Sequence, residues 1–263
     1  MALLAVALVR WLGWKPVRWL PAWGIAMLGV ASHILLDLTN IYGVRLLLPF
    51  SGRWFHWDLT SVIDVTIWAV LLLSVAAPAL GRLVSAEIGD QRKDAGKAGW
   101  AVTGLLLLFA YNYGRSLLHE KAVAQMDAHR YTGLTPRRSG AFPTQNPWRW
   151  TGMAELSTSY VSLPLNLMEN FHMNDAVAMY KAEQSPEVEA AQRSEPFQRF
   201  QEFVDFPLWV TEPAPDAEGS VRVMLLDLRF GNPQSPGFRA VATVDPNRRV
   251  RDALVTMGGP GPR

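Results

Sequence analysis

The sequence predicts an α-helical transmembrane N-terminal half joined to a C-terminal, water-facing α+β domain made mainly of antiparallel sheet. Of the 263 residues, 49% are hydrophobic and 18% are charged, whereas soluble domains usually carry about 25% charged residues. Only eight of the 48 charges fall in residues 1–80. The apolar content excludes disorder for most of the chain, and the absence of cysteine excludes disulfides and thiolate metal sites. The net charge of +2 gives no support to nucleic-acid binding.

Three stretches predict full membrane spans, at Trp19–Leu38, Thr60–Leu80 and Ala98–Leu118. Each is about 20 residues long, which matches roughly 30 Å of hydrocarbon at about 1.5 Å per residue. Met1–Val9 is also apolar but too short to cross a bilayer, so it predicts the end of a partial first helix. We therefore expect a transmembrane helical domain over residues 1–122.

Basic residues set the expected orientation of these spans. The connections at residues 10–18 and 81–97 together carry seven basic side chains. The positive-inside rule places both connections in the cytoplasm. The C-terminal domain would then be periplasmic, although the basic residues that follow Leu118 favour the opposite side.

The connection between the first two predicted spans, Asn40–Leu59, is rich in aromatic residues. Tryptophan prefers the headgroup level of a membrane, where its ring is apolar and its N–H group stays hydrated. We therefore expect this loop to lie on the membrane surface or to re-enter the membrane. The aromatic residues are Phe50, Trp54, Phe55 and Trp57.

The chain changes character after residue 122. Residues 123–150 predict a loop or linker, because Tyr131–Asn146 is rich in glycine, proline, arginine and serine. Residues 151–257 predict the α+β domain, in which the charged segment Asn174–Phe206 is helical with Pro186 and Pro196 at helix starts or breaks. Residues 258–263 are expected to be a disordered tail. The predicted strands, from their alternating or continuous apolar pattern, are Thr158–Leu165, Leu208–Thr211, Val221–Phe230, Phe238–Val244 and Val250–Thr256.

Ionisable residues inside the apolar half are the candidates for chemistry. His33 and Asp37 are four residues apart and share one helix face, while Asp58 and Asp64 follow across the loop. An ionisable group at membrane depth costs at least about 2.5–3.5 kcal/mol and usually faces a cavity or a partner. One imidazole with several carboxylates suits a divalent metal ion such as zinc or manganese, which would acidify a bound water.

Simpler roles for the same residues stay open. A histidine near a helix end is more often a hydrogen-bonding group than a ligand. Asp58 has the spacing of a helix N-cap, and Asp37 could pair with Arg45 at the interface. On this interpretation the polar side chains only tie helices together.

The residue sequence of one region resembles the sequences of a known family. Its strongest pieces are Ser32–Gly43 (SHILLDLTNIYG), Leu48–Ser51 (LPFS), Trp57–Asp58 and Ile63–Asp64. Later pieces at Ala141–Pro143, Asn146–Trp150 and Asp227–Gly231 extend the resemblance to roughly residues 1–250. They are similar to the bacterial membrane-bound, metal-dependent hydrolases related to the LexA-regulated YdjM inner-membrane type. The resemblance implies a multi-span inner-membrane protein. It also implies that metal ligands and catalytic groups lie at matching positions. Those positions are His33 and Asp37 as metal ligands, with Asp58 and Asp64 as further metal ligands or as the catalytic base.

Relatives carry an H-R-G-x-T-H-S run before this region, and the sequence here begins after it. Two explanations are open: either the start codon is placed too late, or the protein is a truncated or decayed member that lacks further ligands and could be inactive. Two hypotheses follow. One is a hydrolase in which a metal-bound water attacks an ester, phosphoester or amide of a lipid-linked or interfacial substrate. The other is a non-catalytic, membrane-anchored binding or assembly protein with membrane lipid as its partner. A transporter has weaker support, because no repeat halves are visible.

Overall fold

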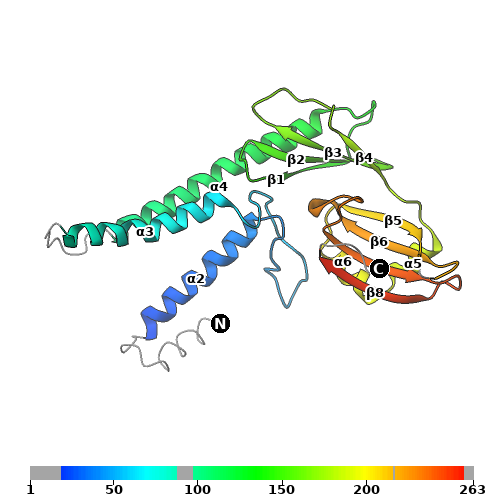
Figure 1. The fold of residues 1–263 in the computed structure, drawn as a ribbon, viewed down its shortest axis with the longest axis horizontal. Helices are drawn as coiled ribbons and strands as arrows, with labels where there is room; N and C mark the ends of the chain where they lie inside the picture. Colours follow the sequence, from blue (N-terminus) through cyan, green and yellow to red (C-terminus); the bar gives the residue numbers. More distant parts are fainter. Residues whose placement is uncertain (1–18, 88–96, 216, 258–263) are drawn as a thin grey trace. The chain divides into compact units, whose positions relative to one another are not determined.

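The computed structural model describes residues 19–87, 97–215 and 217–257, and these residues divide into two compact units. The helical unit comprises residues 19–44, 55–87, 97–119 and 143–147. The sheet unit comprises residues 45–54, 120–142, 148–215 and 217–257. Figure 1 shows their elements. The expected partial helix at Met1–Val9 and the expected disordered tail at 258–263 lie outside the described residues.

Three helices form the helical unit: α2 (Trp19–Thr39), α3 (Val65–Glu87) and α4 (Lys97–Ala128), whose last nine residues belong to the sheet unit. Helices α3 and α4 run antiparallel, because Asp64 at the start of α3 meets Tyr111 of α4 while Ser74 meets Gly104. The approach at Gly104 is close: a Cβ atom there would lie 2.1 Å from Ser74 Oγ. Glycine at this position therefore lets the two backbones come together.

The prediction of three full membrane spans is wrong. Among the described residues only α2 is long and apolar enough to cross a membrane. No residue in its most apolar 18-residue stretch is buried. Helix α3 begins at Val65 rather than at Thr60, because Asp64 accepts the first free N–H groups, so its apolar part is only Val65–Gly81. Helix α4 is long, but Asn112 and Arg115 interrupt its apolar run.

Two four-stranded sheets make up most of the sheet unit, which confirms the predicted antiparallel C-terminal sheet. Each sheet follows chain order, β1-β2-β3-β4 and β5-β6-β7-β8. Strand β1 lies within residues 123–150, where the sequence predicted a loop, and β4 lies within the segment predicted as helical. The strands are β1 (Arg138–Pro143), β2 (Arg149–Glu155), β3 (Ser159–Asn166), β4 (Val177–Tyr180), β5 (Pro207–Pro213), β6 (Val221–Asp227), β7 (Phe238–Val244) and β8 (Val250–Met257).

Each sheet buries one face against a helix. Met126 near the end of α4 packs on Gly152 of β2, and both Met126 and Trp150 are almost fully buried. Helices α5 (Pro186–Gln192) and α6 (Glu195–Gln201) cover the second sheet, and each carries proline in its first turn as the sequence predicted. The core of the second sheet consists of Val188, Ala191, Phe197, Phe200, Val223, Leu225, Ala240, Ala242 and Val244. A single 3₁₀ turn, η1 (Leu228–Phe230), follows β6.

Candidate functional site

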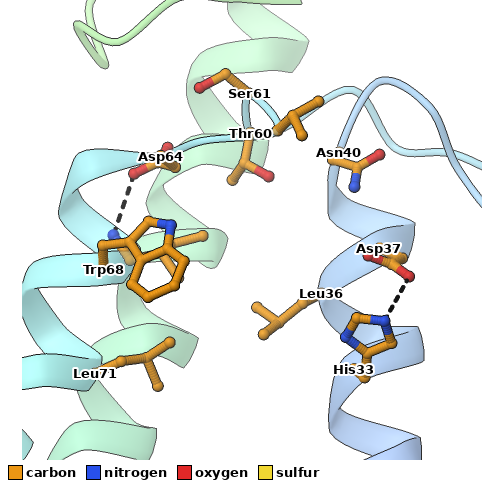
Figure 2. A pocket seen from close by; sticks show the side chains of 11 residues that line it. His33, Leu36, Asp37, Asn40, Thr60, Ser61, Asp64, Trp68 and Leu71 are labelled. Carbon is orange, nitrogen blue, oxygen red and sulfur yellow. Dashed lines mark hydrogen bonds and ion pairs between the residues drawn. The ribbon is translucent and has the colours of Figure 1, made fainter.

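A cavity of about 210 Å³ lies in the helical unit between the end of α2 and the start of α3 (Figure 2). One side comes from the last turns of α2, with His33, Leu36 and Asp37, and from Asn40 directly after the helix. The other side comes from the α3 end, with Asp64 and Trp68. The full lining is His33, Leu36, Asp37, Asn40, Thr60, Ser61, Val62, Asp64, Ile67, Trp68 and Leu71.

His33 and Asp37 form a pair on one face of α2, as their spacing predicted. His33 Nε2 lies 3.4 Å from Asp37 Oδ2. This separation exceeds the usual hydrogen-bond range of about 2.7–3.2 Å. The contact is an ion pair only when the imidazole is protonated, because a neutral imidazole carries no charge. The side chain of His33 is 78% exposed and that of Asp37 is 36% exposed. Both groups can therefore meet a ligand that enters the cavity. Arg45, the partner considered for Asp37, bonds Glu202 within the sheet unit.

Asp64 has a structural role that occupies both of its carboxylate oxygens. Oδ1 accepts the backbone N–H groups of Thr66 (2.9 Å) and Ile67 (3.2 Å), the geometry of a helix N-cap. Oδ2 accepts a hydrogen bond of 2.8 Å from the hydroxyl of Tyr111. Asp64 is only 3% exposed. Its three hydrogen bonds fix the first turn of α3 and attach it to α4.

Asp58 lies apart from the cavity, because it is not among the residues that line it. Its Oδ1 lies 3.0 Å from His56 Nδ1, and both side chains are largely buried. Asp58 adopts a left-handed backbone with φ of 55°. The N-cap role considered for Asp58 is therefore filled by Asp64, six residues later.

The four predicted ligands do not fit a divalent metal as a set. Asp58 is paired with His56 outside the cavity, and the oxygens of Asp64 already accept three hydrogen bonds. Within the described ranges, no group of three or more His, Cys, Asp or Glu side chains comes close enough to hold a metal ion. Three of the four, His33, Asp37 and Asp64, line the same cavity, but only His33 and Asp37 are in contact with each other. We therefore derive no catalytic step through a metal.

The structure adds polar residues that the sequence did not single out. Arg115, only 1% exposed, donates from Nε to the Leu59 carbonyl at 2.6 Å, which ties α4 to the chain before α3. The hydroxyls of Thr39 and Thr60 lie 3.0 Å apart and join the end of α2 to the same segment. Gln145 donates from Nε2 to Ser61 Oγ at 3.0 Å. A charge at the end of an apolar run was the only available signal for Arg115.

These features define a class: a two-unit protein with an apolar helix fit to cross a membrane, a polar cavity at its end and a separate antiparallel-sheet unit. Residues 1–122 match the model of a family described as the YdjM inner membrane protein. The predicted resemblance to the YdjM inner-membrane type is thereby confirmed over those 122 residues. The match carries no confirmation of metal-dependent hydrolysis. No curated protein and no solved structure matches the chain.

Proposed function

We propose that this chain is a membrane-anchored, non-catalytic binding or assembly protein whose polar residues hold the helical unit together. The observation that carries the proposal is the hydrogen bonding of Asp64. Its carboxylate caps α3 and accepts the Tyr111 hydroxyl, so three of its roughly four acceptor positions are used, which disfavours a role as metal ligand or general base. The pairing of Asp58 with His56 supports the same conclusion for the second catalytic candidate.

The sheet unit supplies the binding part of this proposal. A cavity of about 240 Å³ opens within it, lined by β2, β3 and β4 on one side and by the segment after β6 on the other. Its residues mix hydroxyls and thioethers, a surface that suits a small, partly polar group. Placement of this unit in the periplasm follows only from the charges of the sequence and stays a prediction. The lining residues are Thr151, Met153, Ser162, Val177, Met179, Leu228, Arg229, Gly231 and Asn232.

Metal content of the purified full chain tests the proposal. We expect the same divalent-metal content, by elemental mass spectrometry, in the wild type, in His33→Ala and in the neighbouring control Ser32→Ala. We also expect a chelator to leave the unfolding midpoint unchanged, whereas Asp64→Ala lowers it. A metal bound in stoichiometric amount and lost only in His33→Ala would contradict the proposal.

A metal-dependent hydrolase is the second candidate, and the exposed His33–Asp37 pair favours it. Its imidazole and carboxylate face one cavity and are the two described groups that could bind a zinc or manganese ion. The family resemblance adds Asp58 and Asp64, but further ligands would have to come from outside this set of four. The substrate would be lipid-linked or interfacial. Release of product from a phosphoester or ester probe in lipid vesicles, lost in both His33→Ala and Asp37→Asn and kept in Ser32→Ala, would support this candidate over the first.

A further inference from the structure

The tip of the loop between α2 and α3 is a run of five uncharged, exposed residues, Leu46–Leu47–Leu48–Pro49–Phe50. Phe50 is 94% exposed, and the three leucines are 45–58% exposed. The tip has a defined shape, because the backbone N–H groups of Phe50 and Ser51 both donate to the Leu47 carbonyl at 2.8 and 2.9 Å. Contiguous apolar surface of this kind usually marks a contact with a membrane or another molecule.

The base of this loop is fixed to the end of the membrane helix. Val44 and Phe55 exchange two backbone hydrogen bonds of 2.9 Å, which close the loop. Gly43 permits the closure, because its φ is 75° and a Cβ there would lie 2.3 Å from the Phe55 carbonyl oxygen. Trp57 N–H then donates to the Leu38 carbonyl in the last turn of α2 at 2.8 Å.

The two sides of the tip are held by side chains within the sheet unit. Arg45 bonds Glu202 at 3.2 Å, and its guanidinium lies 4.9 Å from the centre of the Trp54 ring. Trp54 packs edge to face on Phe203, with ring centroids 5.1 Å apart. These contacts use the polar and aromatic residues that flank the tip and leave its apolar residues outward.

We propose that residues 46–50 are a wedge that inserts into the lipid bilayer at its surface and holds the sheet unit there. The tip starts seven residues after Thr39, so it lies at most about 25 Å along the chain from the end of α2. Apolar surfaces of this kind enter about 5–10 Å into the boundary between headgroups and acyl chains.

A lipid occupant fits better than a second copy of the chain. Residues 1–122 match an inner-membrane protein family, and the loop base is bonded to the end of the one described candidate span. A bilayer surface is therefore within reach of the tip in every copy. The wedge does not depend on whether the cavity at His33 binds a metal, so its test stands apart from that of the proposed function.

The sequence contains no cysteine, so a single introduced thiol can be labelled cleanly. We would place an environment-sensitive fluorophore at Phe50→Cys in the full chain, reconstituted in vesicles of phosphatidylethanolamine and phosphatidylglycerol. Leu28→Cys on the exposed face of α2 is the positive control, and Tyr180→Cys on β4, 76% exposed, is the water-facing control. Leu48→Cys provides a second position in the wedge if Phe50→Cys fails to fold.

Lipids with a nitroxide near the headgroup end of the acyl chain should quench most of the fluorescence at position 50. Emission there should be shifted to shorter wavelength, and aqueous iodide should have little effect. The proposal is overturned if the label behaves like the one at position 180, quenched by iodide and insensitive to nitroxide lipids. It is also overturned if neither agent quenches the label while energy transfer between two labelled copies appears, since a second copy would then cover the tip.

Discussion

Tyr111 donates a hydrogen bond of 2.8 Å to Asp64, and this bond joins the middle of α4 to the residue that begins α3. Asp64 is one of only three acidic residues in the first 80 positions. The bond therefore gives a structural reason for a carboxylate at that place, and it links the cap of one helix to the packing of the next.

Replacement of Asp64 should lower the stability of the helical unit. We expect Asp64→Ala to lower the free energy of unfolding by about 2 kcal/mol, because it removes a helix cap and a hydrogen bond to a buried charge. Tyr111→Phe removes only one of the three bonds and should cost less. Unfolding in detergent, followed by circular dichroism, measures both. A double variant that is no less stable than Asp64→Ala would confirm that the two residues act together, whereas additive losses would contradict it.

The contact between Gly104 and Ser74 predicts a steric effect. We expect Gly104→Ala to destabilise the α3–α4 pair by about 1–3 kcal/mol, because the new methyl group would meet Ser74 Oγ. Gly99→Ala is the matched control in the same helix, since nothing lies within 4 Å of a Cβ there. Removal of the clash in Gly104→Ala/Ser74→Gly should restore the thermal midpoint. Equal losses in both glycine variants would instead indicate that helix packing is not involved.

Asp227 and Arg229 form an ion pair whose side chains are fully buried, with Nη2 and Oδ2 2.6 Å apart. Burial raises the pKa of Asp227, and the Arg229 guanidinium opposes that increase. Arg229→Met should therefore destabilise the sheet unit by about 3–5 kcal/mol, because the carboxylate stays buried without its partner. The double variant Asp227→Asn/Arg229→Met should regain part of the loss. Chemical denaturation of the full chain measures the free energy of unfolding of each variant. A double variant that is less stable than Arg229→Met would refute this explanation.

Glu155 should make the stability of the sheet unit depend on pH. Burial raises the pKa of Glu155, but the charges of Lys181, 2.7 Å away, and Arg138, 3.3 Å away, outweigh it and hold this pKa below its ordinary value of 4.5. A carboxylate whose pKa is lower in the folded state stabilises the fold at pH values above about 4.5. That stabilisation is lost as the pH falls through the lower pKa of the folded state.

The advantage in melting temperature of the wild type over Glu155→Gln should therefore be constant near neutral pH and shrink as pH falls below about 5. Glu212→Gln, which removes a more exposed carboxylate with one arginine partner, is the control and should show a smaller change. An advantage of the wild type that persists unchanged in acid would contradict the assignment.

Local sequence patterns were sufficient to predict the bounds of the strands that have regular apolar spacing. The predicted run Phe238–Val244 coincides with β7, and Val250–Thr256 falls one residue short of β8. Pro186 and Pro196 lie in the first turns of α5 and α6 because proline lacks the N–H that such positions leave unpaired. Strand β1 has arginine, glycine and proline in six residues, so its sheet partner rather than its own pattern stabilises it.

The bounds of the membrane spans could not be predicted from local sequence. Hydropathy alone counted residues 60–64 as helix, but the hydrogen bonds of Thr60 to Thr39 and of Asp64 to the first turn of α3 hold them outside it. Thr39 and Thr60 are 21 residues apart, so no short window of residues could reveal their bond.

The sequence by itself determined that the chain has an apolar half and a sheet-forming half, because side-chain periodicity and charge are local properties. It also determined that His33 and Asp37 share a helix face, since four residues make about one turn. Only the tertiary structure decided what the sparse acids do. Whether a carboxylate is a ligand, a cap or a partner depends on which distant N–H or O–H groups reach its oxygens, and at Asp64 those groups come from α3 and α4.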